Sequence, residues 1–243
     1  MQAVLITLVT VFCSTFSAVA DARPLDTCIP GNAMAVYFGR PSADTPTTRP
    51  TSTLNQLAAW VIALKAMGVI PHEGRLIADI MATLPMLGER SYAVALLDIT
   101  ARKLGPGSYR LNDMQAALIV DTQGIQVAFD RRIRDLLATY TDAENGTIDA
   151  LRFGDVSYHR LTDKRLPEWA ITEWCTVGDL LIVSFGKGAF EQVVNTVVKQ
   201  SPSLAKVAWY RKAHRRCHGP ASRIEVYVDI AQIKARLNEV IVG

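Results

Sequence analysis

Residues 148–185 read IDALRFGDVSYHRLTDKRLPEWAITEWCTVGDLLIVSF, and this stretch decides the fold class. Short runs rich in apolar, β-branched and aromatic residues occupy 148–153, 156–161, 169–175 and 180–185. Such runs are typical of β-strands, and turn residues separate them at Gly154-Asp155 and at Val177-Gly178-Asp179. Strands joined by short turns pair antiparallel, so the stretch predicts two antiparallel strand pairs.

The same pattern continues on both sides of this stretch. Apolar runs over 92–101 and 114–121 predict another pair, with Gly105, Pro106, Gly107 and Asn112 in a long connection. Further runs predict a first strand over 33–39 and a last strand over 223–228.

Helical periodicity fills the segments between these strands. It predicts helices over 54–68, 76–84, 124–140 and 190–198, one that starts at Ser203, and a final helix capped by Asp229. Strands pair with sequence neighbours more often than they alternate with helices, which excludes a doubly wound parallel sheet. We therefore expect an α+β fold, a largely antiparallel sheet with helices packed mainly on one face.

Three apolar strands end in a small polar residue just before a helix: Leu118–Asp121, Leu181–Ser184 and Val226–Asp229. Two explanations stay open. Each polar residue can be an N-cap, whose side chain accepts hydrogen bonds from the first helical amides. Alternatively, a strand–helix unit is duplicated along the chain.

The chain has 243 residues, a formal net charge of +3, 49% hydrophobic and 20% charged residues. This composition excludes an intrinsically disordered chain and a disulfide-packed miniprotein. After the N-terminus, no apolar run approaches the roughly 20 residues of a membrane span. We expect a single α+β domain over 54–243. The segment 21–53 precedes this domain. It contains a Pro/Thr-rich loop over 40–53 and the strand 33–39, and we expect this strand to join the domain.

The first 20 residues have the pattern of a secretory signal peptide. They carry no charged side chain, contain an apolar stretch over 4–16, and end in the small residues Ala18-Val19-Ala20. A second candidate cut follows Ala22. We therefore expect an extracytoplasmic protein, periplasmic or secreted, without a transmembrane span in the mature chain.

Removal of this leader leaves Cys28, Cys175 and Cys217, an odd number for an oxidising compartment. One disulfide plus one free thiol is possible, and so are three unbridged cysteines. The sequence does not choose between these arrangements.

Three short motifs resemble known sites but lack required parts. Gly186-Lys187-Gly188 lacks the four-residue span and the hydroxyl of a phosphate-binding loop, so we interpret it as a glycine turn. Ser203-x-x-Lys206 has the spacing of penicillin-binding enzymes without their companion elements, and Ser203 is interpreted as an N-cap. The segment 214–218, HRRCH, lacks the first cysteine of a haem attachment motif and a further ligand for zinc. We expect no metal and no cofactor.

Residues 192–224 hold seven Lys and Arg residues and no Asp or Glu. At about 100° per residue, a helix over this part places Arg211, Lys212, Arg215 and Arg216 on one side. With Lys206 they form a candidate contact for an anionic partner, such as anionic lipid, lipopolysaccharide or an acidic envelope protein. A solvated helix face is the alternative. The leader argues against nucleic acid as the partner.

Several of these elements together resemble a known family. The segment 29–33, IPGNA, precedes a Tyr-containing strand, 201–204, SPSL, opens a helix, and Tyr227-Val228-Asp229 lies near the end. Over most of residues 29–238 the chain resembles a widespread family of bacterial extracytoplasmic proteins of unknown function. The resemblance implies an extracytoplasmic location, and it supplies no catalytic residues.

The leading hypothesis is a non-catalytic binding or envelope-associated module that uses the basic residues. The alternative is an extracytoplasmic hydrolase whose site is assembled from residues distant in the sequence. A deep pocket with converging carboxylate, His and hydroxyl groups would favour the hydrolase. A basic stripe without such a pocket would favour the binding module.

Overall fold

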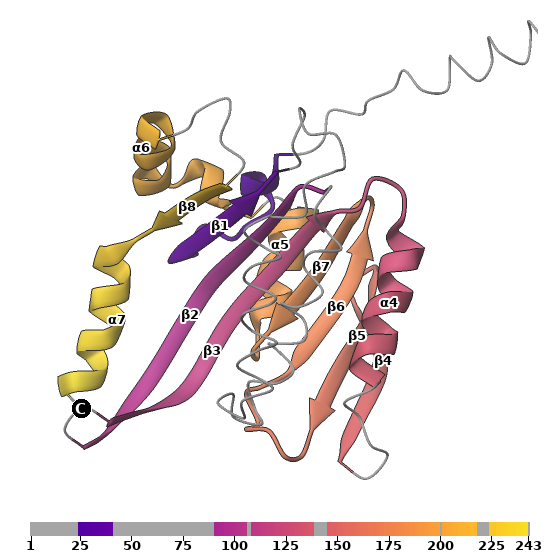
Figure 1. Ribbon diagram of the computed structural model, residues 1–243, viewed down its shortest axis with the longest axis horizontal. Helices are drawn as coiled ribbons and strands as arrows, with labels where there is room; N and C mark the ends of the chain where they lie inside the picture. The colour runs from indigo at the N-terminus through magenta and orange to yellow at the C-terminus, as the bar shows by residue number, and fades with distance from the viewer. Residues whose placement is uncertain are drawn as a thin grey trace, which may run out of the picture.

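The computed structural model describes residues 24–40, 90–105, 108–138, 145–199, 201–217 and 224–242 (Figure 1). Its strands form one sheet: β1 (Ala35–Gly39), β2 (Tyr92–Gly105), β3 (Ser108–Asp121), β4 (Gly146–Phe153), β5 (Val156–Asp163), β6 (Thr172–Val177), β7 (Leu180–Phe185) and β8 (Ile224–Val228). Its helices are η1 (Leu25–Thr27), α4 (Gln126–Ala138), α5 (Ala189–Lys199), η3 (Leu204–Lys206), α6 (Ala208–Cys217) and α7 (Ile230–Val242).

The strand order is β4-β5-β6-β7-β3-β2-β1-β8, and every pairing is antiparallel. The four strands predicted over 148–185 lie side by side as β4 to β7. β7 then pairs with β3, with Val183 opposite Leu118. The C-terminal strand β8 closes the other edge by pairing with β1, with Tyr227 opposite Val36. The prediction of an α+β fold with a largely antiparallel sheet is confirmed.

The β2–β3 pair is longer than the sequence suggested. Both strands have 14 residues, and their pairing continues to Gly105 and Ser108. The predicted long connection is therefore wrong, because most of 102–113 belongs to the strands. This part of the two strands contains polar residues such as Arg102 and Lys103, so a hydrophobic pattern does not detect it. The pairing of β2 with β3 depends on backbone hydrogen bonds, which polar residues also form.

The middle of the sheet, at β7, is buried on both faces. On one face, Leu180 and Ile182 of β7 pack in the main core with Phe190 of α5. On the other face, Leu181 and Val183 form a second cluster, against which Ile133 of α4 packs.

The helices α4 and α5 therefore lie on opposite faces (Figure 1), and the expectation of helices mainly on one face is not confirmed. The uninterrupted apolar run of β7 reflects this two-sided burial, since a half-exposed strand would alternate with polar residues.

The helix predicted from Ser203 is interrupted. A single 3-10 turn, η3, is followed by Val207 in an extended conformation, with φ −79° and ψ 131°, and α6 begins at Ala208. Ser203 precedes this turn but makes no side-chain capping hydrogen bond, so its interpretation as a hydroxyl N-cap is wrong.

The three strand-end polar residues have different roles. Asp229 caps α7 as predicted, because its Oδ1 accepts a hydrogen bond from the Gln232 amide at 3.0 Å. Asp121 accepts one from the Gln123 amide, ahead of a helix that begins at Gln126. The Ser184 hydroxyl donates to the Glu173 carbonyl instead. N-capping of a following helix therefore does not explain all three polar residues at the strand ends.

The segment before β1 is part of the core. Cys28, Ile29, Ala33 and Met34 have no exposed surface. Among the described residues no disulfide joins Cys28, Cys175 and Cys217; the first two are buried and the third is exposed.

Several predicted segments lie outside the described residues. They are the leader 1–20, the Pro/Thr-rich loop beyond Arg40, and the helices over 54–68 and 76–84. Within the described ranges, no helix has the length and apolar character needed to cross a membrane.

Candidate functional site

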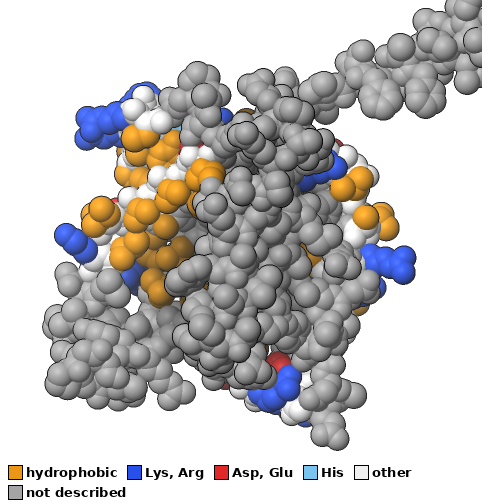
Figure 2. Space-filling model, in the orientation of Figure 1, with side chains coloured by type: hydrophobic (Ala, Val, Ile, Leu, Met, Phe, Trp, Pro, Cys, Tyr) orange, Lys and Arg blue, Asp and Glu red, His pale blue; other side chains and the backbone are white. Residues whose placement is uncertain are grey.

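The helix α6 carries the basic residues singled out in the sequence. Its inner side is fixed in the main core, where Tyr210 is buried and Trp209 and Ala213 pack beside it. The cationic residues lie on the exposed side of the helix: Arg211, Lys212, Arg215 and Arg216. Figure 2 shows Lys and Arg side chains gathered at the upper left, where Figure 1 places α6.

These four cations make no ion pair with any side chain in the described ranges. Elsewhere, Arg40 and Arg160 each pair with a buried glutamate. Lys206 is exposed as well, but it lies in η3, and the extended Val207 separates it from the helix face. The structure thus brings the four α6 residues onto one face and leaves Lys206 in the preceding turn. Their contact with an anionic partner stays a prediction.

An aromatic cluster holds α6 on the sheet. The Tyr210 ring lies 5.1 Å from the Tyr227 ring and 6.2 Å from the Phe38 ring, measured between centroids. The His214 ring, one turn further along α6, lies 5.5 Å from Tyr210 and 5.9 Å from Tyr227. The Tyr210–Tyr227 contact is edge-on and the other three are tilted. Aromatic packing of this kind adds to the burial energy, so α6 presents its cationic side from a fixed position.

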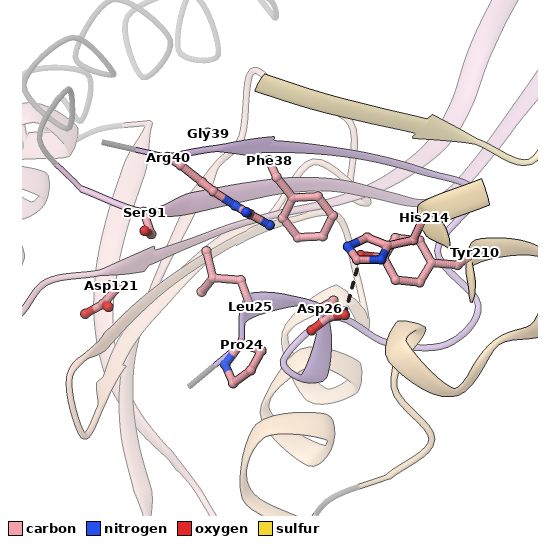
Figure 3. A pocket seen from close by; sticks show the side chains of 10 residues that line it. All are labelled: Pro24, Leu25, Asp26, Phe38, Gly39, Arg40, Ser91, Asp121, Tyr210 and His214. Carbon is pink, nitrogen blue, oxygen red and sulfur yellow. Dashed lines mark hydrogen bonds between the residues drawn. The ribbon is translucent and has the colours of Figure 1, made fainter. Parts of the chain in front are cut away.

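A pocket of about 320 Å³ lies under the inner side of α6 (Figure 3). It is bounded by η1, by the end of β1, by the ends of β2 and β3 and by α6. The lining residues are Pro24, Leu25, Asp26, Phe38, Gly39, Arg40, Ser91, Asp121, Tyr210 and His214. The sequence does not predict this pocket, because its residues come from five separate segments and no motif joins them.

Two polar contacts organise one side of the pocket. The Tyr210 hydroxyl donates a hydrogen bond to Asp26 Oδ2 at 3.5 Å. Burial, and then the nearby Asp26 carboxylate, raise the pKa of Tyr210 well above the ordinary value for a phenol. This phenol is therefore a neutral hydrogen-bond donor at physiological pH.

Arg40 forms an ion pair with Glu225, which lies outside the pocket lining. Its Nη2 lies 3.4 Å from Glu225 Oε1, and Glu225 is only 6% exposed. The other oxygen of Glu225 accepts a hydrogen bond of 2.7 Å from the Tyr227 hydroxyl. Burial and this hydrogen bond raise the pKa of Tyr227. The charge of Arg40 is thus already balanced by a carboxylate outside the lining.

The pocket contains carboxylates, an imidazole and hydroxyls, which is the composition that a hydrolase would need. Its arrangement differs from that of a serine triad, because Ser91 and His214 lie on opposite sides of the pocket (Figure 3). The Ser91 hydroxyl makes no hydrogen bond to the described residues. A nucleophile requires a base within hydrogen-bond reach, and this arrangement does not provide one for Ser91.

A second cluster of charged groups involves β5, β6 and α5, and Glu173 is its fully buried member. Arg160 Nε donates to Glu173 Oε1 at 2.8 Å, and its Nη2 contacts the same oxygen at 2.7 Å. Burial raises the pKa of Glu173, which is 1% exposed, although Arg160 opposes this shift. Glu191 Oε2 is also buried and makes no hydrogen bond within the described ranges. Because solvent does not reach Glu173, we interpret the cluster as structural.

The glycine turn predicted at 186–188 is confirmed, since Gly186 and Gly188 both have positive φ, at 96° and 84°. Of the segment 214–218, His218 lies outside the described residues. The described residues contain no group of three or more His, Cys, Asp and Glu side chains placed to hold a metal ion.

Comparisons of the chain with protein-family models, with curated proteins and with solved structures find no match. The resemblance to a family of bacterial extracytoplasmic proteins therefore stays a prediction.

Proposed function

We propose that the protein is an extracytoplasmic, non-catalytic module that binds an anionic component of the cell envelope through α6. One observation carries the proposal: the four cations on the exposed side of α6 have no anionic partner in the described part of the chain. Like charges on neighbouring helical positions repel each other, and an anionic ligand would remove this repulsion. The leader-like N-terminus supports the location.

The test is a charge reversal with a control of equal net charge. One variant carries Glu at the four α6 positions: Arg211, Lys212, Arg215 and Arg216. The control carries Glu at four exposed cations outside α6: Arg131, Arg152, Lys187 and Lys234. Binding is measured on vesicles that contain phosphatidylglycerol and on immobilised heparin, at low and at high salt.

We expect the α6 variant to bind at least about a hundredfold more weakly than the control, since each Lys or Arg at an anionic surface is worth about 1 kcal/mol. High salt should remove the difference, because screening weakens exposed charge interactions. Equal, salt-sensitive binding of the two variants would mean that net charge alone acts, and the proposal would be wrong.

A hydrolase is the second candidate, favoured by the pocket under α6 with its His214, Tyr210 and two carboxylates. A general acid–base pair in this pocket would have to involve His214, because it is the only histidine of the lining. Hydrolysis of activated esters and amides, compared between the unmodified chain and His214→Gln, tests this candidate. Turnover that disappears in His214→Gln would favour the hydrolase over the binding module.

A further inference from the structure

The pocket under α6 has a different charge from the outer face of the same helix. Within the described ranges Asp26 makes no ion pair, and its side chain has one hydrogen bond, which the Tyr210 hydroxyl donates. Asp121, on the other side of the pocket, accepts a hydrogen bond from the Gln123 amide and likewise has no cationic partner in these ranges. Because Glu225 balances Arg40, the lining has an excess of negative charge at neutral pH.

Aromatic rings line the pocket beside Asp26 and across from it. Phe38 and Tyr210 line it, with ring centroids 6.2 Å apart. Figure 3 shows Asp26 facing Tyr210 and His214, with Phe38 across the cavity. A carboxylate beside aromatic rings is the arrangement that recognises organic ammonium groups, since the carboxylate pairs with the charge and the rings attract it through their faces.

The pocket has the size of a small-molecule site. A volume of about 320 Å³ lies at the lower end of the range for ligand pockets in proteins. Leu25, Pro24 and Phe38 supply apolar walls for the carbon chain of a ligand. The Tyr210 hydroxyl holds Asp26 on one side and leaves its other oxygen for a ligand.

We infer that this pocket binds a small organic cation with a primary ammonium group, and that Asp26 is its counter-ion. The ammonium group donates hydrogen bonds to the Asp26 carboxylate and lies against the aromatic rings, and its carbon chain follows Leu25 and Pro24. This site is separate from the proposed anionic contact, because the ligand meets the inner side of α6 and the envelope component meets the outer side.

The test uses two probes of equal chain length and opposite charge, butylammonium and butyrate, titrated calorimetrically into the full chain. Butylammonium should bind and butyrate should not. Asp26→Asn should weaken butylammonium binding by at least about tenfold, because it removes a charged hydrogen-bond acceptor. The control Asp149→Asn removes an exposed carboxylate from β4 and should leave binding unchanged.

A third variant, Tyr210→Phe, keeps Asp26 in place and tests the inference even if Asp26→Asn fails to fold. It keeps the ring and releases the carboxylate, so butylammonium should bind at least as tightly as to the unmodified chain. Butyrate binding as tight as butylammonium binding would instead assign the pocket to Arg40 and overturn the inference. Absence of butylammonium binding, equal binding by Asp26→Asn, or loss of binding in Tyr210→Phe would also overturn it.

Discussion

Gly186 offers the sharpest test of the packing between the sheet and α5. It lies between β7 and α5, and its φ of 96° is a conformation that residues with a Cβ rarely adopt. Its amide donates a hydrogen bond of 2.8 Å to the Ile171 carbonyl, which holds the turn in place. A Cβ added here would lie 1.9 Å from the Met114 carbonyl oxygen and 2.9 Å from the carbonyl carbon. Both atoms are backbone atoms of β3, so a side-chain rotation cannot relieve the contact.

Gly186→Ala should therefore cost stability in two ways. Positive φ costs an alanine roughly 1–2 kcal/mol. The displacement of β3 or of the turn adds the cost of overpacking, typically about 1–3 kcal/mol. The expected loss in the free energy of unfolding is thus about 2–5 kcal/mol, a large part of the stability of an ordinary domain.

The matched control is Gly154→Ala, in the turn between β4 and β5. Gly154 has a φ of 59°, and a Cβ there would meet no atom within 4 Å. This variant should lose only the backbone cost, roughly 1–2 kcal/mol. Denaturant unfolding, followed by circular dichroism, measures both variants. Equal losses would show that the close approach of β3 to Gly186 has no energetic weight, which would refute the reasoning.

Three further predictions concern buried groups. Arg160→Met leaves the buried Glu173 carboxylate without its cation. It should lower the free energy of unfolding, measured in denaturant titrations, by about 3 kcal/mol. A loss below about 1 kcal/mol, which is typical of a surface ion pair, would contradict this prediction. Burial raises the pKa of Cys175 to about 12, so in the native protein a thiol reagent should modify the exposed Cys217 quickly and Cys175 only after denaturation, as peptide mass spectrometry would show. The pKa of Tyr210 is raised above its value of 10.0 in the unfolded chain, so its contribution to stability is present below pH 10 and is lost as the pH rises through its folded pKa. Unfolding titrations from pH 8 to pH 12 should show this decline, and it should be shallower in Tyr210→Phe; equal slopes would contradict the prediction.

The sequence by itself determined the kind and order of most described elements. The four strands over 148–185 and the Asp229 cap follow from local chemistry: β-branched and aromatic runs, glycine turns and a carboxylate beside free amides. The exposed side of α6 also follows from helical periodicity alone, because four cations at this spacing must share one face. Such features depend on residues within a few positions of each other.

Only the tertiary structure decided which faces are covered and where a pocket forms. The placement of α4 opposite α5 depends on the path of the chain across the sheet, and a hydrophobic run does not record that path. The contact between Asp26 and Tyr210 joins residues 184 positions apart, so no local spacing encodes it. The pairing of β8 with β1 brings Glu225 behind Arg40 and thereby sets the charge of the pocket. These contacts arise from long-range packing. The hydrophobic effect depends on the total apolar area removed from water, so segments far apart in the sequence can form one site.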